Sequence, residues 1–177
     1  MPDTIIHDYD PGWAEAFDLE RSRIEQQLGS RVAAVEHIGS TSVVGLAAKP
    51  LIDIMVGVRV DSIADCIALL TALDYQRDTS GDFDGRVFLR RLAPDGQATH
   101  HLSLTEPGGA YWRDQIAFRD ALRADPVLVS GYAELKRKLA ADHGRSLEYT
   151  MAKTDFVREA LASVGHQPQS GWASESS

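Results

Sequence analysis

The stretch that decides the fold is His37–Val56, which reads HIGSTSVVGLAAKPLIDIMV. Residues 32–38, which overlap the start of this stretch, form a short run rich in Val and Ile, as is typical of a β-strand. Gly39 and the three hydroxyl residues after it end that strand in a loop. A second apolar run follows Pro50, and we expect it to form a strand over residues 51–58. The stretch therefore predicts a strand, a turn of small residues and another strand.

The second strand carries one charged residue, Asp53. Side chains of a strand alternate between two faces. One face therefore holds Ile52, Ile54, Val56 and Val58, and the other holds Leu51, Asp53, Met55 and Gly57. A carboxylate among apolar neighbours is costly unless it is paired or binds a metal ion. Asp53 is thus a candidate ligand for a metal.

The Gly39-Ser40 turn is a candidate phosphate site, because small residues after a strand let backbone N–H groups approach an anion. A tight turn without any ligand explains the same two residues. The turn is not a P-loop, since Lys49 lies four residues beyond Gly45 instead of next to it. The combination of the turn with Asp53 makes the stronger case for a site.

The rest of the chain predicts a small sheet with helices on both sides of it in the sequence. Asp10-Pro11 is a typical helix start, and apolar periodicity predicts helices over residues 11–28, 61–73, 110–124, 127–142 and 146–164. Residues 86–92 and 98–105 flank a turn and should pair as a hairpin. The fold class is therefore α+β, with a small mixed β-sheet flanked by helices at both ends.

Length and composition indicate one domain, expected over residues 1–165, with a disordered polar tail over 166–177. The formal net charge of −8 argues against binding of bulk nucleic acid. No long apolar run or basic leader is present, so we expect a cytoplasmic protein that does not enter a membrane. The single cysteine, Cys66, falls in an apolar helical pattern and should be buried.

These residues carry a resemblance to a known family. The run from His37 to Val56 closely resembles the signature of the GrpB-like family of the nucleotidyltransferase superfamily. Other segments that look like family positions are Tyr9-Asp10-Pro11-Gly12-Trp13, His100-His101-Leu102, Phe118–Arg123, and Tyr149 with Lys153. Members of the superfamily have Gly-Ser after a strand and an acidic residue on the next strand, as Gly39-Ser40 and Asp53 are arranged here. The resemblance implies a nucleotidyltransferase-like fold.

The resemblance also implies an activity, the Mg²⁺-dependent transfer of a nucleoside monophosphate from a nucleoside triphosphate to a small-molecule or protein acceptor. Its catalytic residues would be Asp53, which also holds the metal, with Ser40 and Gly39. The residues that it implies for phosphate binding are Gly39, Ser40, Thr41, Ser42, Lys49, Arg119 and Lys153, and those for a substrate pocket are His37, His101, Ser103 and Tyr149. Lys49 is equally well explained as a solvated lysine before a proline.

Two departures from the family pattern bear on the activity. Superfamily members that transfer nucleotides usually have a second acidic residue where this chain has Met55, and a thioether does not replace a carboxylate for Mg²⁺. A second carboxylate would then come from Glu36 or Glu106, or one metal would act alone. Ser103 stands where a second histidine is expected on the strand. The alternatives are therefore an inactive nucleotide-binding or accessory module, and a small-molecule pocket with a purely structural turn.

Overall fold

The computed structural model describes residues 6–141 and 147–173, which form five helices and five strands within those ranges. The helices are α1 (Gly12–Leu28), α2 (Ile63–Thr71), α3 (Ala110–Ala124), α4 (Pro126–Ala141) and α5 (Leu147–Ser163). The strands are β1 (Val32–Ile38), β2 (Ile52–Val58), β3 (Gln76–Arg77), β4 (Val87–Leu92) and β5 (Ala98–Thr105). The sequence predicts every one of these elements except the two-residue β3, to within a few residues of these bounds.

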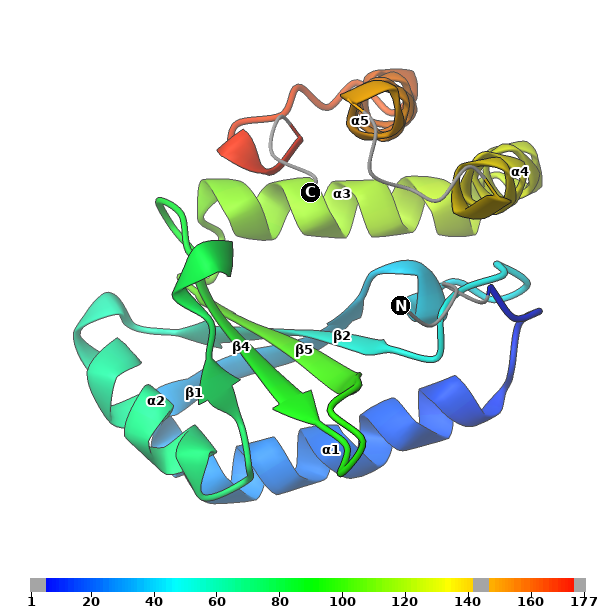
Figure 1. The fold of residues 1–177 in the computed structure, drawn as a ribbon. Coiled ribbons are helices and arrows are strands. Elements are labelled where there is room, and N and C mark those ends of the chain that lie inside the picture. Colours follow the sequence, from blue (N-terminus) through cyan, green and yellow to red (C-terminus); the bar gives the residue numbers. More distant parts are fainter. Residues whose placement is uncertain (1–5, 142–146, 174–177) are drawn as a thin grey trace.

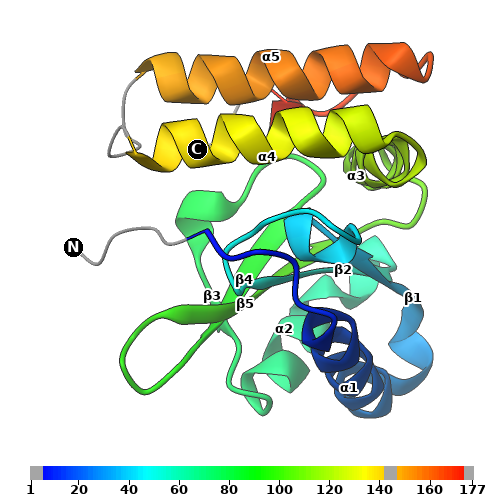
Figure 2. The same cartoon turned by 90° about the vertical axis from the view of Figure 1, so that its right-hand side faces the viewer.

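The strands form one sheet in the order β1-β2-β5-β4-β3. β2 and β5 are parallel, and the other neighbouring pairs are antiparallel. Helices α1 and α2 cover one face of this sheet, and α3, α4 and α5 form a layer over the other face (Figures 1 and 2). The prediction of an α+β fold with a small mixed sheet is therefore confirmed.

The core beneath the sheet joins α1 and α2 to the apolar faces of the strands. Trp13, Phe17 and Ile24 of α1 are buried there against strand residues such as Ile54. The predicted start of α1 is also present, since the backbone N–H of Gly12 donates to Oδ1 of Asp10 at 2.8 Å. Cys66 on α2 is fully buried in the same core, as its apolar surroundings in the sequence predict.

Two further clusters lie on the opposite face of the sheet. One packs α3, α4 and α5 around residues such as Phe118, Tyr132 and Leu161. A smaller cluster joins Ile38 and Met55 of the sheet to Tyr111 of α3. This second layer of helices is what covers the polar face of β5 and the face of β2 that carries Asp53.

Residues 166–173, which the sequence predicts as part of a disordered tail, instead pack against α3. The carboxylate of Asp114 is fully buried and accepts hydrogen bonds from His166 Nε2 at 2.7 Å, from the backbone N–H groups of Gln169 and Ser170, and from Ser170 Oγ. Trp172 then lies against Phe118 with ring centres 5.6 Å apart. The folded unit therefore continues past residue 165, and residues 174–177 lie outside the described part.

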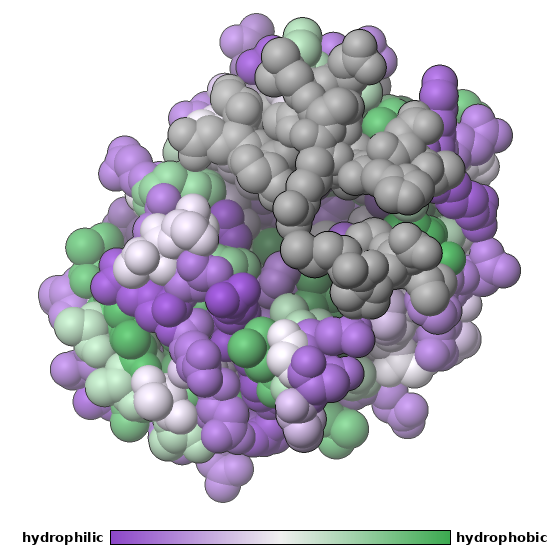
Figure 3. Space-filling model, in the orientation of Figure 1, coloured by the Kyte–Doolittle hydropathy of each residue, from purple (hydrophilic) through white to green (hydrophobic). Residues whose placement is uncertain are grey.

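The surface mixes polar and apolar residues. On the face drawn in Figure 3, hydrophobic residues are scattered among hydrophilic ones. Among the described residues, no helix is both long enough and apolar enough to cross a membrane.

Candidate functional site

The turn after β1 is built by local hydrogen bonds. Gly39 has φ +69°, a left-handed conformation that favours glycine, and residues Ser40–Ser42 form one turn of 3-10 helix. Ser42 donates from its Oγ to the carbonyl of Gly39 at 2.6 Å, and Thr41 Oγ1 donates to the carbonyl of Leu51 at 3.2 Å. The turn is therefore fastened both to itself and to the start of β2.

Asp53 lies directly against this turn. In the antiparallel register of β1 and β2, Ile38 is opposite Asp53, so the chain leaves β1 beside the carboxylate. A Cβ atom placed on Gly39 would lie 2.8 Å from Cγ of Asp53, a distance at which one of the two would have to move. Glycine is thus required at position 39 both by its φ angle and by the close approach of Asp53.

The parallel pairing of β2 and β5 brings predicted site residues together. Asp53 is paired with His101, and Met55 with Ser103, so all four side chains lie on the face covered by α3. His101 Nδ1 is 3.4 Å from Oδ1 of Asp53, and both side chains are about one third exposed. Strand alternation in the sequence predicts this shared face.

Two lysines of the helical layer interact electrostatically with Asp53. Burial lowers the pKa of Lys153 on α5, Asp53 opposes that shift, and Lys49 adds to it. Burial also lowers the pKa of Lys136 on α4, to about 7, with Lys153 lowering it further and Asp53 again opposing. Lys136 Nζ donates to the backbone carbonyl of Ala47. The site thus combines one carboxylate with two lysines, which suits a phosphate-bearing ligand.

Lys136 was missed by the sequence analysis. It belongs to a basic run, Lys136-Arg137-Lys138, in which nothing but helical phase distinguishes the inward residue. Tyr132 and Leu139 of the same helix are buried. Lys136 lies four residues after Tyr132 and three before Leu139, so it is on the same buried face of the helix. The phase of α4 was therefore the available signal.

The donor set around Asp53 fits one magnesium ion better than two. Met55 fills the second carboxylate position and is buried against Ile38 and Tyr111. Glu106 follows the far end of β5, about 16 Å along the strand from the level of Asp53. Among the described residues, no group of three or more His, Cys, Asp or Glu side chains is placed to hold a metal. Mg²⁺ is often held by one carboxylate together with substrate phosphates and water, and Asp53 suits that role.

Glu36, the other carboxylate considered, is held by Arg119. Their closest atoms are 2.7 Å apart, and the same guanidinium contacts Asp120 and the carbonyl of His37. Arg123, one turn further along α3, donates two hydrogen bonds to the carbonyl of Ser42 at 3.0 and 2.8 Å. Both arginines therefore fasten β1 and the turn to α3, and the guanidinium of Arg119 is already engaged by carboxylates.

His37 points to the opposite face of the sheet from Asp53. Its ring stacks on Phe17 of α1 with ring centres 4.5 Å apart, and its Nε2 lies 3.0 Å from Thr41 Oγ1. Burial lowers its pKa to about 4, opposed by Asp53 and assisted by Arg123 and Arg119. The structure thus separates His37 from His101 and Ser103, while the side chain of Tyr149 lies outside the described residues.

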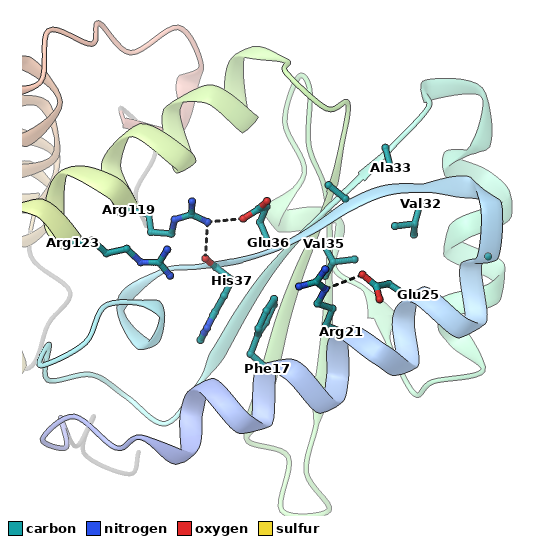
Figure 4. Close-up of a pocket in the computed structure, with 12 residues that line it drawn as sticks. Phe17, Arg21, Glu25, Val32, Ala33, Val35, Glu36, His37, Arg119 and Arg123 are labelled. Carbon is teal, nitrogen blue, oxygen red and sulfur yellow. Dashed lines mark hydrogen bonds and ion pairs between the residues drawn. The ribbon is translucent and has the colours of Figure 1, made fainter.

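A cavity of about 480 Å³ lies beside β1, between α1 and α3 (Figure 4). Its lining includes Arg21 and Glu25 of α1, Glu36 of β1, and Arg119 and Arg123 of α3. Most of these charges are paired with one another, as the dashed lines in Figure 4 show for Arg21 with Glu25 and for Arg119 with Glu36. The cavity therefore follows the outer edge of the sheet and does not coincide with the Asp53 site.

Comparisons with known proteins give the family. The family model described as "GrpB protein" matches residues 3–163. The glutamate-rich protein GrpB of Alkalihalophilus pseudofirmus is 32% identical over 166 residues, which cover 90% of this chain and 94% of that protein. The UPF0157 protein YqkA of Bacillus subtilis is 34% identical over 154 residues, and the match spans 86% of this chain but only 44% of YqkA.

One solved structure agrees with that assignment. The crystal structure of the conserved protein GrpB from Enterococcus faecalis matches with a TM-score of 0.79 and 32% identity, over 92% of this chain and all of that one. The Cid1 poly(U) polymerase matches with a TM-score of 0.44 and 15% identity, over 76% of this chain and 39% of that one. On the match of its sequence to the family model and of its fold to a solved member, this chain belongs to the GrpB family.

Proposed function

We propose that this chain binds a nucleoside triphosphate with Mg²⁺ at the Asp53 site and transfers its nucleoside monophosphate to a small-molecule or protein acceptor. One observation carries the proposal: a partly exposed carboxylate is seated against a glycine turn and interacts with one lysine from α4 and one from α5. That combination suits a metal-bound polyphosphate, because the carboxylate attracts the metal and the lysines attract the phosphate oxygens.

Each residue of the site has a distinct task under this proposal. Asp53 would hold the metal, which would supply positive charge to offset that of the phosphates. The backbone N–H groups of the turn at Gly39 and Ser40 would donate to a phosphate, and Lys136 and Lys153 would neutralise it from the helical layer. Arg123 would keep the turn in place through the carbonyl of Ser42.

Titration calorimetry with each of the four ribonucleoside triphosphates, with and without Mg²⁺, tests binding. Wild type should bind in a Mg²⁺-dependent manner, and Asp53→Asn, which keeps the size of the side chain, should lose most of that dependence. Asp61→Asn is the matched control, because Asp61 is an exposed aspartate paired with Arg59 beyond the other end of β2. Binding that ignores both the metal and Asp53 would contradict the proposal.

A second candidate function, nucleotide binding without transfer, is favoured by Met55. This residue occupies the place of a second metal-binding carboxylate and is fully buried in an apolar cluster. Release of labelled pyrophosphate from a triphosphate, measured with cell extract cleared of macromolecules and then with denatured protein as acceptors, separates the two functions. Release that depends on Asp53 supports transfer, whereas binding without release in every acceptor pool supports the second candidate.

A further inference from the structure

Arg86, just before β4, is enclosed by aromatic rings on the face of the sheet that carries Asp53. Its guanidinium carbon lies 4.4 Å from the ring centre of Phe88, 5.3 Å from that of Phe83 and 5.5 Å from that of Tyr111. Its Nε donates to Ser103 Oγ at 3.0 Å. Rings on several sides and one hydrogen bond fix the plane of the guanidinium, so that little side-chain freedom is left to lose on binding.

The charge of Arg86 has no carboxylate partner among the described residues. Two nearby arginines, on β3 and β4, have carboxylate partners. Arg77 pairs with Asp82 at 2.7 Å, and Arg90 pairs with Asp78 at 3.4 Å. Among the described residues, the guanidinium of Arg86 makes a single hydrogen bond, the one to Ser103. No fully buried side-chain nitrogen there lacks a partner, so each of the two terminal nitrogens of Arg86 keeps some exposure to solvent.

Arg86 is also at a useful distance from Asp53. Ser103, to which it is bound, lies two residues beyond His101 on β5, and His101 is the partner of Asp53 across the parallel strands. The spacing of neighbouring strands and the rise per residue place the Cα atoms of Asp53 and Ser103 about 8 Å apart. That spacing is within the length of a small molecule that carries two charged groups.

We propose that Arg86 binds a carboxylate or phosphate group of the acceptor, so that the acceptor is a small anionic molecule. The two free terminal nitrogens form a planar fork that matches two oxygens of such a group. The lysines around Asp53 serve the phosphates of the nucleotide, and Arg86 serves the second substrate. The role of this anion as the acceptor rests on the proposed transfer function, whereas the anion site at Arg86 rests on its own geometry.

Inorganic phosphate and acetate are suitable probes, because each carries the expected group alone. We expect both to shift the Nε–H resonance of Arg86 in a ¹H–¹⁵N spectrum of the full chain, with and without saturating Mg²⁺ and a non-hydrolysable ATP analogue. Phosphate affinity should fall about tenfold or more in Arg86→Gln and less in Arg86→Lys, which keeps the charge but loses the fork. Arg59→Gln, which removes an arginine that is 80% exposed, should bind as wild type does.

Three outcomes would overturn the proposal. Unchanged phosphate affinity in Arg86→Gln, with or without a lower melting temperature, would leave Arg86 with packing alone. Full displacement of phosphate by the ATP analogue would assign the anion to the nucleotide. An equal loss of affinity in Arg59→Gln would indicate an effect of overall charge. If Arg86 binds phosphate while no triphosphate binds at Asp53, the proposed function fails, the acceptor role fails with it, and the anion site stands.

Discussion

Gly39 and Asp53 touch across the first two strands, with Cγ of Asp53 2.8 Å from where a Cβ of residue 39 would lie. Gly39→Ala should therefore displace the carboxylate and impose a left-handed φ on alanine, at a cost of about 1–2 kcal/mol in the free energy of unfolding. We expect Mg²⁺-triphosphate affinity to fall about tenfold or more. Calorimetry and urea unfolding measure the two effects.

Gly45→Ala is the matched control for that variant. Gly45 also has a positive φ, +81°, but a Cβ there would meet nothing within 4 Å. The control should lose stability through its φ angle alone, and its affinity should be unchanged. Equal losses of affinity in both variants would show that strain in the loop, and not displacement of Asp53, controls binding.

Lys136 should make nucleotide binding take up a proton. Its pKa is lowered to about 7, so at pH 8 the amine is mostly neutral. A bound phosphate favours the charged form and raises the pKa, so binding at pH 8 should take up as much as about one proton. Affinity should accordingly fall as the pH rises from 7 to 9. Calorimetry in two buffers with different ionisation enthalpies measures this uptake, and Lys136→Met should abolish it. Uptake that persists in Lys136→Met would assign the proton elsewhere.

Glu20 anchors a buried ion pair beneath the sheet. Arg91 Nη1 lies 2.8 Å from each of its oxygens, and Tyr75 donates to it at 3.0 Å. Glu20→Gln should therefore lower the free energy of unfolding by about 3 kcal/mol, because the buried cation loses its counter-charge. Glu25→Gln, which breaks the exposed pair with Arg21 on the same helix, should cost less than about 1 kcal/mol.

The difference in the free energy of unfolding between wild type and Glu20→Gln should depend on pH through the pKa of Glu20. Burial acts to raise this pKa, but the hydrogen bonds and charge of Arg91 outweigh burial and lower it. A lowered carboxyl pKa contributes stability above the unfolded pKa, and that stability is lost as the pH falls through the folded pKa. The gap between wild type and Glu20→Gln should thus narrow in acid. Urea unfolding between pH 3 and pH 7 checks this, and a constant gap would contradict the assignment.

Asp114 should make the last described segment essential for stability. Burial acts to raise its pKa, but hydrogen bonds from His166, Ser170 and Gln169 outweigh burial and lower it. A chain that ends at Gly165 loses these donors, so it should melt well below wild type. Asp114→Asn in the full chain should cost about 1–3 kcal/mol. A truncated chain with the melting temperature of wild type would contradict this role.

Local patterns in the sequence account for most of the fold. Strand alternation predicts the shared face of Asp53 and Met55, and the turn between residues 92 and 98 predicts the β4–β5 hairpin. The same alternation places His37 on the face opposite Glu36, but the family resemblance assigned it to the substrate pocket. The faces of a strand and the pairing of a hairpin can thus be predicted from the sequence, because residues close together in the chain determine them.

The remaining features depend on contacts between distant residues. Glu20 and Arg91 are 71 residues apart, and Asp114 meets a segment more than 50 residues later. That segment is polar and short, and it is held by contacts with the buried carboxylate of Asp114 and with the ring of Phe118. Arg86 is likewise one basic residue among several until Tyr111 of α3 is placed over it. Packing of whole elements, which one sequence does not encode locally, decides such pairs.

The cavity beside β1 also bears on whether the edge of the sheet is open to another strand. β1 is an outer strand of the sheet, and an unpaired strand edge is a template on which another chain can add a strand. Here its backbone is irregular near Val32, Arg119 occupies the carbonyl of His37, and charged side chains from α1 and α3 flank the rest. The other edge strand, β3, has only two residues. Each edge of the sheet is thus a poor template for an added strand, one because of its charged side chains and the other because it is short.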